Sequence, residues 1–312
     1  MLRNALLYLS NQPRVFKFVR TNRIAKGFAS RFVAGETLDT AVAAVRELNR
    51  RGITASLDLL GESVHNEAEA RAAGAEYLKI LDRIQQEKLD ANVSVKLTAM
   101  GLDVSEELCI SIMHDVLGRA RDYGSFVRLD MESSDYTQKT LDLFEHRLYP
   151  EFRGTVGVVL QSYLYRTASD VEHMNALGAR VRLCKGAYKE PASVAYPEKK
   201  DVDENYLKCM EQLLLHGNYP GIATHDEAII ARTTAFARQN AVAPDQFEFQ
   251  MLYGVRRDLQ EKLVKDGWRM RCYVPFGTQW YPYLMRRLAE RPANVAFITG
   301  NVVREMFGSR KS

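Results

Sequence analysis

Short apolar runs rich in β-branched residues recur along the chain, and amphipathic segments separate them. Runs of this length are typical of buried strands, whereas the Ala-, Leu-, Glu- and Arg-rich stretches between them have the periodicity of helices. Segments 36–52 and 203–217 both end in glycine, which commonly follows a helix. The predicted strands are 53–61, 93–98, 126–132, 156–163, 181–188, 221–226, 247–254 and 270–277.

Strand and helix alternate throughout, which predicts parallel βαβ units. Eight such strands favour a (β/α)8 TIM barrel, of the α/β class, over an open sheet. No Gly-, Ser- or Pro-rich linker divides the 312 residues. We therefore expect an N-terminal helical arm, residues 1–35, followed by one barrel domain, residues 36–312.

The N-terminal arm has no acidic residue before Glu36, although basic residues recur along it. Arg-rich, acid-poor starts occur in transit peptides and on anionic membrane surfaces. Because LLYL and FVR alternate with the charges, we favour a helical arm packed against the domain, and peripheral contact with a membrane is the alternative. The basic residues are Arg3, Arg14, Lys17, Arg20, Arg23, Lys26 and Arg31.

Composition narrows the class of protein. A net charge of +4 and a pI near 8.8 are too weakly basic to indicate nucleic-acid binding. The four cysteines are scattered, without the spacing of a metal site, and are typical of reduced, mostly buried thiols in a cytoplasmic protein. No apolar run approaches the roughly 18 residues of a membrane helix. We expect a cytoplasmic globular protein without a metal site.

Polar residues gather where the predicted strands end. Catalytic groups of such barrels lie at the C-terminal ends of the strands. One charge there could cap a helix or pair with a neighbour, but so many favour a bound ligand. The residues are Asp58, Glu62, Lys96, Asp130, Glu132, Gln161, Arg182, Lys185, Thr224, His225, Gln250 and Tyr273.

Cations among these residues suit a phosphate or a carboxylate. The GxGxxG and GxxxxGK[ST] motifs are both absent, so side chains and loop amides would hold any nucleotide. Near the C-terminus, tyrosines beside Arg286 and Arg287 fit a small ligand with an apolar body and one carboxylate. Structural explanations remain open: a surface ion pair of Arg287 with Glu290, and a core histidine at His225.

Several motifs resemble proline dehydrogenase, in the same order and at the corresponding strand ends. They are VSVKLTAMG, RLDMES, VLQSYLYRT, RLCKGAYKEP, ATHD, FEFQMLYG and YPYLMRRLAERP, spanning about Gly52 to Pro292. The chain resembles the small monofunctional bacterial type, because KGAYKEP lacks the tryptophan that follows KGAY in the bifunctional proline utilization proteins. Cys184 departs from the valine common in relatives.

The resemblance implies a distorted (β/α)8 barrel that binds FAD. It implies oxidation of L-proline to Δ1-pyrroline-5-carboxylate, the first step of proline catabolism, with hydride passing from proline C5 to flavin N5. Electrons would then pass to a membrane quinone. Asp130 and Arg182 would be the catalytic residues. Arg286 and Arg287 would clamp the proline carboxylate, held by Glu290.

The resemblance also implies the remaining site residues. Lys96 would face the substrate, backed by Asp130. The pyrrolidine ring of proline would be enclosed by Leu252, Tyr273 and Tyr283. The flavin and its pyrophosphate would be held by Met131, Gln161, Arg182, Lys185, Gly186, Ala187, Thr224 and His225. From its position after the first strand, Glu62 could pair with Arg286 and close the site.

Two other function classes stay open. A Schiff-base lyase, similar to a class I aldolase, would use Lys96 or Lys185 as a nucleophile at a strand end. Such a lysine should be desolvated rather than surrounded by carboxylates. A barrel that binds a carboxylate without catalysis is the third class.

Overall fold

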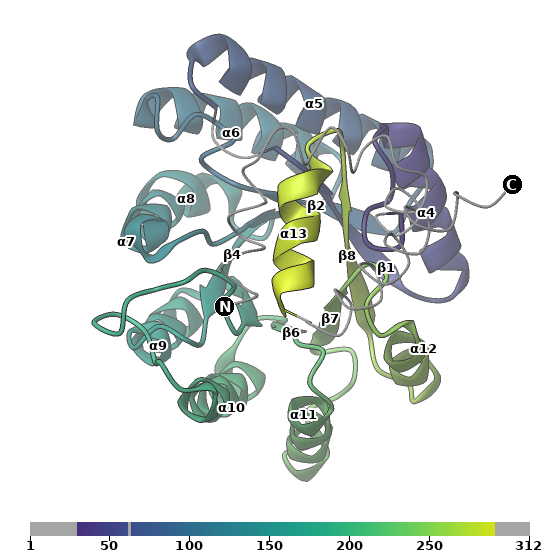
Figure 1. Cartoon of the computed structure of the whole chain (residues 1–312), viewed down its shortest axis with the longest axis vertical. Helices are drawn as coiled ribbons and strands as arrows, with labels where there is room; N and C mark the ends of the chain where they lie inside the picture. Colours follow the sequence, from purple (N-terminus) through teal and green to yellow (C-terminus); the bar gives the residue numbers. More distant parts are fainter. Residues whose placement is uncertain (1–29, 62–63, 291–312) are drawn as a thin grey trace, which may run out of the picture.

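Eight parallel strands close into a barrel within residues 30–61 and 64–290, the part of the chain that the computed structural model describes, side chains of 286–290 excepted. Each predicted strand overlaps an observed one, which confirms the (β/α)8 barrel (Figure 1). The strands are β1 (Thr54–Leu59), β2 (Ala91–Val95), β3 (Val127–Leu129), β4 (Val156–Gln161), β5 (Arg180–Cys184), β6 (Gly221–Ala223), β7 (Glu248–Leu252) and β8 (Met270–Phe276).

Helices alternate with the strands and surround the barrel (Figure 1). The predicted helices at 36–52 and 203–217 are present as α4 and α10. A π-helical turn, Phe144–Leu148, joins two of the others. The helices are α4 (Leu38–Arg50), α5 (Glu67–Gln86), α6 (Glu106–Asp122), α7 (Ser134–Leu143), α8 (Tyr149–Phe152), α9 (Thr167–Leu177), α10 (Lys199–His216), α11 (Glu227–Gln239), α12 (Arg257–Lys265) and α13 (Trp280–Glu290).

Side-chain caps explain where three helices begin. Asn66 accepts a hydrogen bond from the backbone N–H of Glu69 at 2.9 Å, ahead of α5. Ser105 caps α6 through Leu108 N at 3.3 Å, and Asp226 caps α11 through Ala228 N at 3.1 Å. Because a cap satisfies a free amide of the first turn, it fixes the residue at which the helix starts. The caps therefore set the lengths of the loops after β1, β2 and β6.

The inside of the barrel is polar. Arg182 on β5 donates hydrogen bonds to Ser94 on β2 and to Gln250 on β7, which are not neighbours of β5, so these side chains cross the interior. Residues of opposite parity, such as Leu57 and Val95, are apolar and fully buried. Branched aliphatic side chains usually fill such interiors. Here the apolar residues lie outside, under the helices, and leave the interior to polar groups.

Two glycines make room for these long polar side chains. A Cβ atom on Gly157 would lie 2.3 Å from the carbonyl oxygen of Arg180 and 2.7 Å from Nη1 of Arg128. A Cβ atom on Gly221 would lie 2.4 Å from Nε2 of Gln250. Since real Cβ contacts are longer than this, side chains at these positions would displace the interior groups.

Helix α13 does not join the outer ring. Figure 1 shows it lying across the face of the barrel, and its Tyr283 is buried. The segment before α4 holds its start, because Glu36 accepts a hydrogen bond from Trp280 Nε1 at 3.0 Å. The backbone N–H of Gly277 also donates to Gly35 O at 3.0 Å. The chain that follows β8 is thereby directed over the mouth of the barrel.

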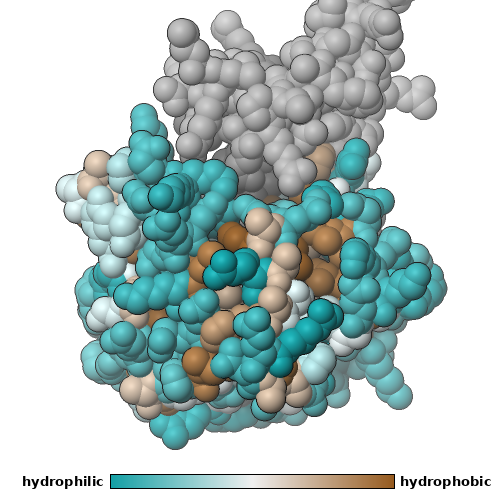
Figure 2. All heavy atoms as spheres, turned by 90° about the horizontal axis from the view of Figure 1, so that it is seen from below, coloured by the Kyte–Doolittle hydropathy of each residue, from teal (hydrophilic) through white to brown (hydrophobic). Residues whose placement is uncertain are grey.

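The face shown in Figure 2 is mostly hydrophilic, with apolar atoms visible in recesses between polar side chains. None of the described helices combines the length and hydropathy that a membrane span requires. The prediction of reduced, mostly buried cysteines is confirmed: all four are free thiols, and only Cys184 is not fully buried. The predicted arm, residues 1–35, lies outside the described residues up to residue 29.

Candidate functional site

A cavity of about 660 Å³ lies at the C-terminal ends of the strands. Its wall includes every predicted site residue whose side chain the structure describes. These are Lys96, Asp130, Met131, Gln161, Arg182, Lys185, Gly186, Ala187, Thr224, His225, Leu252, Tyr273 and Tyr283. Residues far apart in the sequence thus meet in one place, as the position of polar groups at the strand ends predicted.

Four predicted residues cannot be located in this way. Glu62 lies outside the described residues. Arg286, Arg287 and Glu290 belong to the backbone of α13, but their side chains lie outside the described part of the chain. The carboxylate clamp and the Glu62 gate therefore stay predictions.

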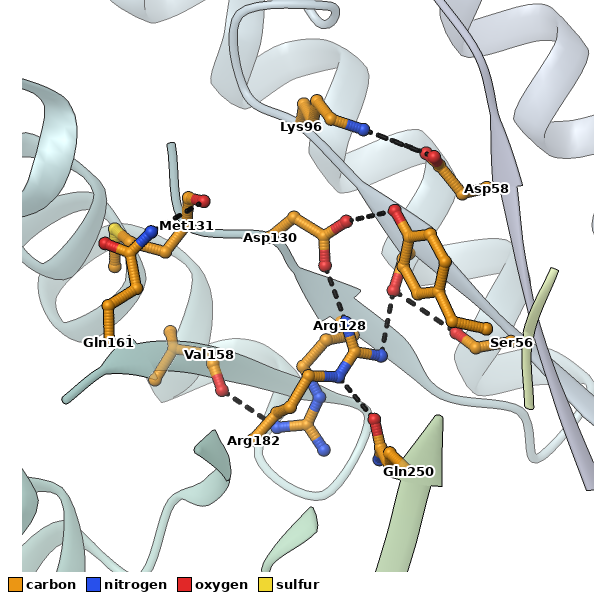
Figure 3. Close-up of polar contacts among 12 residues, drawn as sticks. Ser56, Asp58, Lys96, Arg128, Asp130, Met131, Val158, Gln161, Arg182 and Gln250 are labelled. Atoms are coloured by element: carbon orange, nitrogen blue, oxygen red, sulfur yellow. Dashed lines mark hydrogen bonds and ion pairs between the residues drawn. The ribbon is translucent and has the colours of Figure 1, made fainter. Parts of the chain in front are cut away.

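Arg182 connects the strands beneath the cavity, and its side chain is almost fully buried. Its Nη1 donates to Asp130 Oδ1 at 2.8 Å, and its Nη2 donates to Ser94 Oγ at 3.1 Å (Figure 3). Its Nε donates to Gln250, and the ring of Tyr273 lies 5.3 Å from its Cζ. Removing one partner of a buried ion pair typically lowers the free energy of unfolding by about 3–5 kcal/mol, because the remaining charge is left buried without a partner. These contacts hold a positive charge in one position below the ligand.

Asp130 is held from two sides. Arg182 occupies Oδ1, and the hydroxyl of Tyr273 donates to Oδ2 at 2.7 Å. Burial, followed by the charges of Asp130 and Asp58, raises the pKa of Tyr273 well above its ordinary value. Tyr273 therefore remains a hydroxyl donor at neutral pH, and both of the Asp130 oxygens accept from groups that keep their protons.

The structure corrects the predicted partner of Lys96. Its Nζ lies 3.1 Å and 3.3 Å from the two carboxylate oxygens of Asp58, and the two side chains point toward one another in Figure 3. Asp130, the predicted partner, is instead bound to Arg182 and Tyr273. Lys96 and Asp58 face each other because β1 and β2 are neighbours, with Asp58 paired in register with Ser94.

Asp58 is a cavity residue that the sequence analysis placed among the polar strand ends but to which it gave no role in the site. The sequence pattern of this strand already indicated that Asp58 faces the inside of the barrel. Asp58 and Ser56 are the polar positions of TASLDL, and they alternate with apolar ones, as expected for a strand whose polar side faces inward. The same parity places Asp58 beside Lys96 at the mouth of the barrel.

On the other side of the cavity, Lys185 lies between two carboxylates. Its Nζ is 2.5 Å from Asp203 and 3.0 Å from Asp226. Burial alone would raise the pKa of Asp226, but the hydrogen bond and charge of Lys185 lower it below its ordinary value. The ion pairs therefore link the segment after β5 to α10 and to the start of α11.

His225 has a structural contact as well as a place on the cavity wall. The backbone N–H of Leu252 donates to its Nε2 at 2.9 Å. Nε2 therefore carries no proton, and a neutral ring is protonated at Nδ1. The interpretation of His225 as a histidine satisfied by backbone is partly correct, and the ring still borders the cavity.

The cavity offers groups that a flavin requires. Gln161 donates through Nε2 to Glu132 O at 3.2 Å, while its Oε1 is buried and accepts no hydrogen bond from the described residues. A buried acceptor of this kind needs a partner, and the ring N–H of an isoalloxazine would supply one. Gly186 has φ +106°, and a Cβ there would lie 2.5 Å from the Tyr163 ring. Only glycine lets the loop pass so close to the Tyr163 ring.

The site does not resemble that of a Schiff-base lyase. Such an enzyme needs an uncharged, desolvated lysine. Lys96 is paired with Asp58, and Lys185 with Asp203 and Asp226. A lysine held between carboxylates does not fit that requirement.

Comparisons with known proteins agree with this geometry. The family described as proline dehydrogenase matches residues 41–300. The chain is 43% identical to proline dehydrogenase 1 of Bacillus subtilis subsp. natto, over 98% of this chain and 100% of that protein. It is 40% identical to the proline dehydrogenase of Deinococcus radiodurans, covering 97% and 98% respectively.

A solved structure is also similar. It is proline utilization A from Bdellovibrio bacteriovorus, inactivated by N-propargylglycine, with a TM-score of 0.81 and 28% identity. The match covers 92% of this chain but 34% of that larger one. The family match, the near full-length sequence similarity and the shared fold show that the chain belongs to the proline dehydrogenase family.

Proposed function

We propose that this protein oxidises L-proline to Δ1-pyrroline-5-carboxylate with FAD as its cofactor and passes the electrons to a membrane quinone. The observation that carries the proposal is the convergence of Lys96, Asp130, Arg182 and Tyr273 on one cavity of a family member. Family membership supports the reaction, and the chemistry of the cavity supports the cofactor.

The carboxylate of proline would bind to the arginine pair of α13. Tyr283 lines the cavity, and positions 286, 287 and 290 follow it at i+3, i+4 and i+7. Such positions share one face of a helix. On this spacing, Arg286, Arg287 and Glu290 would share the helix face of Tyr283. Adjacent arginines, which normally serve two surfaces, can both serve one here.

The proline ring would lie among Leu252, Tyr273 and Tyr283, all on the cavity wall. Holding both ends of a small molecule fixes the reacting carbon at near-attack distance. Bound FAD supplies the chemistry of this reaction by accepting the hydride at N5. The fixed charge of Arg182 would stabilise the electron density that arrives there.

The rest of the cofactor would lie along the second half of the cavity. Gln161 and Met131 would contact the flavin ring, with Gln161 Oε1 as the acceptor that has no described donor. Lys185, Thr224 and His225 would bind the pyrophosphate together with the loop amides of Gly186 and Ala187. All seven residues border the cavity.

An absorbance spectrum tests the reaction and the cofactor together. The purified protein should be yellow, and anaerobic L-proline should bleach the flavin band, because the hydride reduces the ring. A soluble quinone analogue should restore the colour. A colourless protein, or a band that proline leaves unchanged, contradicts the proposal. Borohydride trapping with substrate would instead indicate a Schiff base.

Substitution Arg287→Met tests the clamp. Loss of hydrogen bonds between charged groups costs about 1.5–3 kcal/mol, so KM for proline should rise roughly 10- to 100-fold while FAD stays bound. Steady-state kinetics and the flavin absorbance measure the two effects. Arg232→Met, at an exposed position of α11, is the control and should leave KM unchanged. An unchanged KM in Arg287→Met would falsify the clamp.

Substitution Glu62→Gln tests the gate. If Glu62 pairs with Arg286 when the site closes, the variant should close less completely, with altered kinetics and a flavin more exposed to solvent. Proline kinetics and fluorescence quenching by a soluble quencher report on the two. Glu67→Gln, on the exposed start of α5, is the control. Wild-type values of both quantities in Glu62→Gln exclude the gate.

A quinone acceptor requires contact with a bilayer. The basic residues of the arm are the candidates, because polybasic segments are attracted to anionic lipids by about 1 kcal/mol per residue. The protein should co-sediment with anionic liposomes at low salt, with or without proline, and less so at high salt. If the protein does not sediment with liposomes in either redox state, the arm does not bind the bilayer and this part of the proposal is wrong.

A further inference from the structure

Two carboxylates border the cavity on neighbouring sides of Lys96, and their donors differ in kind. Asp130 accepts from Arg182 and from the Tyr273 hydroxyl. Asp58 accepts hydrogen bonds from Lys96 at 3.1 Å and 3.3 Å, and the Tyr273 hydroxyl also faces it. A guanidinium does not release its proton in proteins, and Tyr273 keeps its own. A lysine ammonium can release a proton, so only the Lys96–Asp58 pair can move one.

Asp58 is buried, with 1% of its side chain exposed, whereas 11% of Lys96 is exposed. Both side chains line the cavity where the substrate would bind, and Lys96 is the more exposed of the two. The other charged or titratable groups facing Asp58 are Asp130 from β3, Tyr273 from β8 and Tyr77 from α5. This order of groups forms a path from the cavity through Lys96 to a buried carboxylate.

The electrostatics of the pair favour a carboxylate that can take up a proton. Burial raises the pKa of Asp58 above its ordinary value, the charge of Lys96 opposes that rise, and Asp130 adds to it. A group whose pKa is raised toward the working pH is better suited to accept a proton than an ordinary carboxylate. The geometry of the path and the direction of this shift agree.

We propose that Asp58 receives the proton that the ammonium group of bound proline releases before oxidation, and that Lys96 carries it between them. This inference rests on the proposed function. One N–H bond of the substrate breaks, and its electron pair stays on nitrogen, where it is needed to expel the hydride. Lys96 gains that proton while passing one of its own to Asp58.

The step is balanced without a redox partner. The substrate ammonium becomes an amine, the Asp58 carboxylate becomes a carboxylic acid, and Lys96 ends as the ammonium it was at the start. The proton returns to solvent before the next turnover. Asp130, bound to Arg182 and Tyr273, keeps its role in holding the floor of the cavity.

The pH dependence of flavin reduction distinguishes this role from a structural one. Without Asp58, only proline that is already deprotonated in solution can react. In Asp58→Asn, the rate constant of flavin reduction divided by the Kd of proline should fall roughly 10²- to 10⁴-fold at neutral pH. It should then climb about tenfold per pH unit and approach the wild-type value as pH nears the pKa of the proline amine. Lys96→Met, which breaks the path at its other end, should show the same slope.

Asp130→Asn is the matched control, with the same chemical change in the same cavity. It should lower the rate by a factor that does not depend on pH, because it disturbs Arg182 and Tyr273 instead of the proton path. Parallel pH profiles for wild type, Asp58→Asn and Lys96→Met overturn the inference, as does a sloping profile in Asp130→Asn alone. If Asp58→Asn does not retain its flavin, the pH profile of Lys96→Met alone tests the inference: a steep slope supports it, and a profile parallel to wild type overturns it. Wild-type flavin that proline fails to bleach indicates failure of the proposed function instead.

Discussion

The structure depends on a buried arginine at the centre of the barrel. Arg182 contacts Asp130 on β3, Ser94 on β2 and Gln250 on β7, so one side chain links strands that are distant in the barrel. Because a buried cation is stable only with its full set of partners, the register of these strands and the position of the charge depend on each other. A slip of one residue in β2 or β3 would turn Ser94 or Asp130 away from it.

The need of Arg182 for polar partners explains why polar side chains fill the inside of this barrel, where branched aliphatic ones are usual. Below Arg182 lies Arg128, which donates to Val158 O at 3.0 Å (Figure 3). Burial, together with the charges of Arg182 and Arg180, lowers the pKa of Arg128 well below its ordinary value. Gly157 leaves the space for its guanidinium. Two guanidinium groups, of Arg182 and Arg128, thus lie under the cavity, together with the carboxylates of Asp130 and Glu248.

Much of this arrangement could be predicted from the sequence, because it follows from local patterns. The apolar runs predicted the strands. The polar residues at their ends, such as Gln161 and Lys185, predicted the wall of the cavity. The partner of Lys96 could not be predicted, because Asp58 and Asp130 lie on either side of it, on β1 and β3, and only side-chain directions decide between them. The position of α13 over the mouth also depends on distant contacts, such as that of Trp280 with Glu36.

The difference between the two carboxylates follows from what their neighbours can do with a proton. Arg182 and Tyr273 hold Asp130 in a fixed position, which suits a group that orients others. Asp58 is paired with a lysine and has little access to water, which suits the proposed proton acceptor. Two aspartates of the same cavity therefore differ in chemistry because of the donor that each one meets. In the proposed proton transfer, Lys96 would connect Asp58 to the substrate nitrogen, whereas Asp130 is bound to Arg182 and Tyr273.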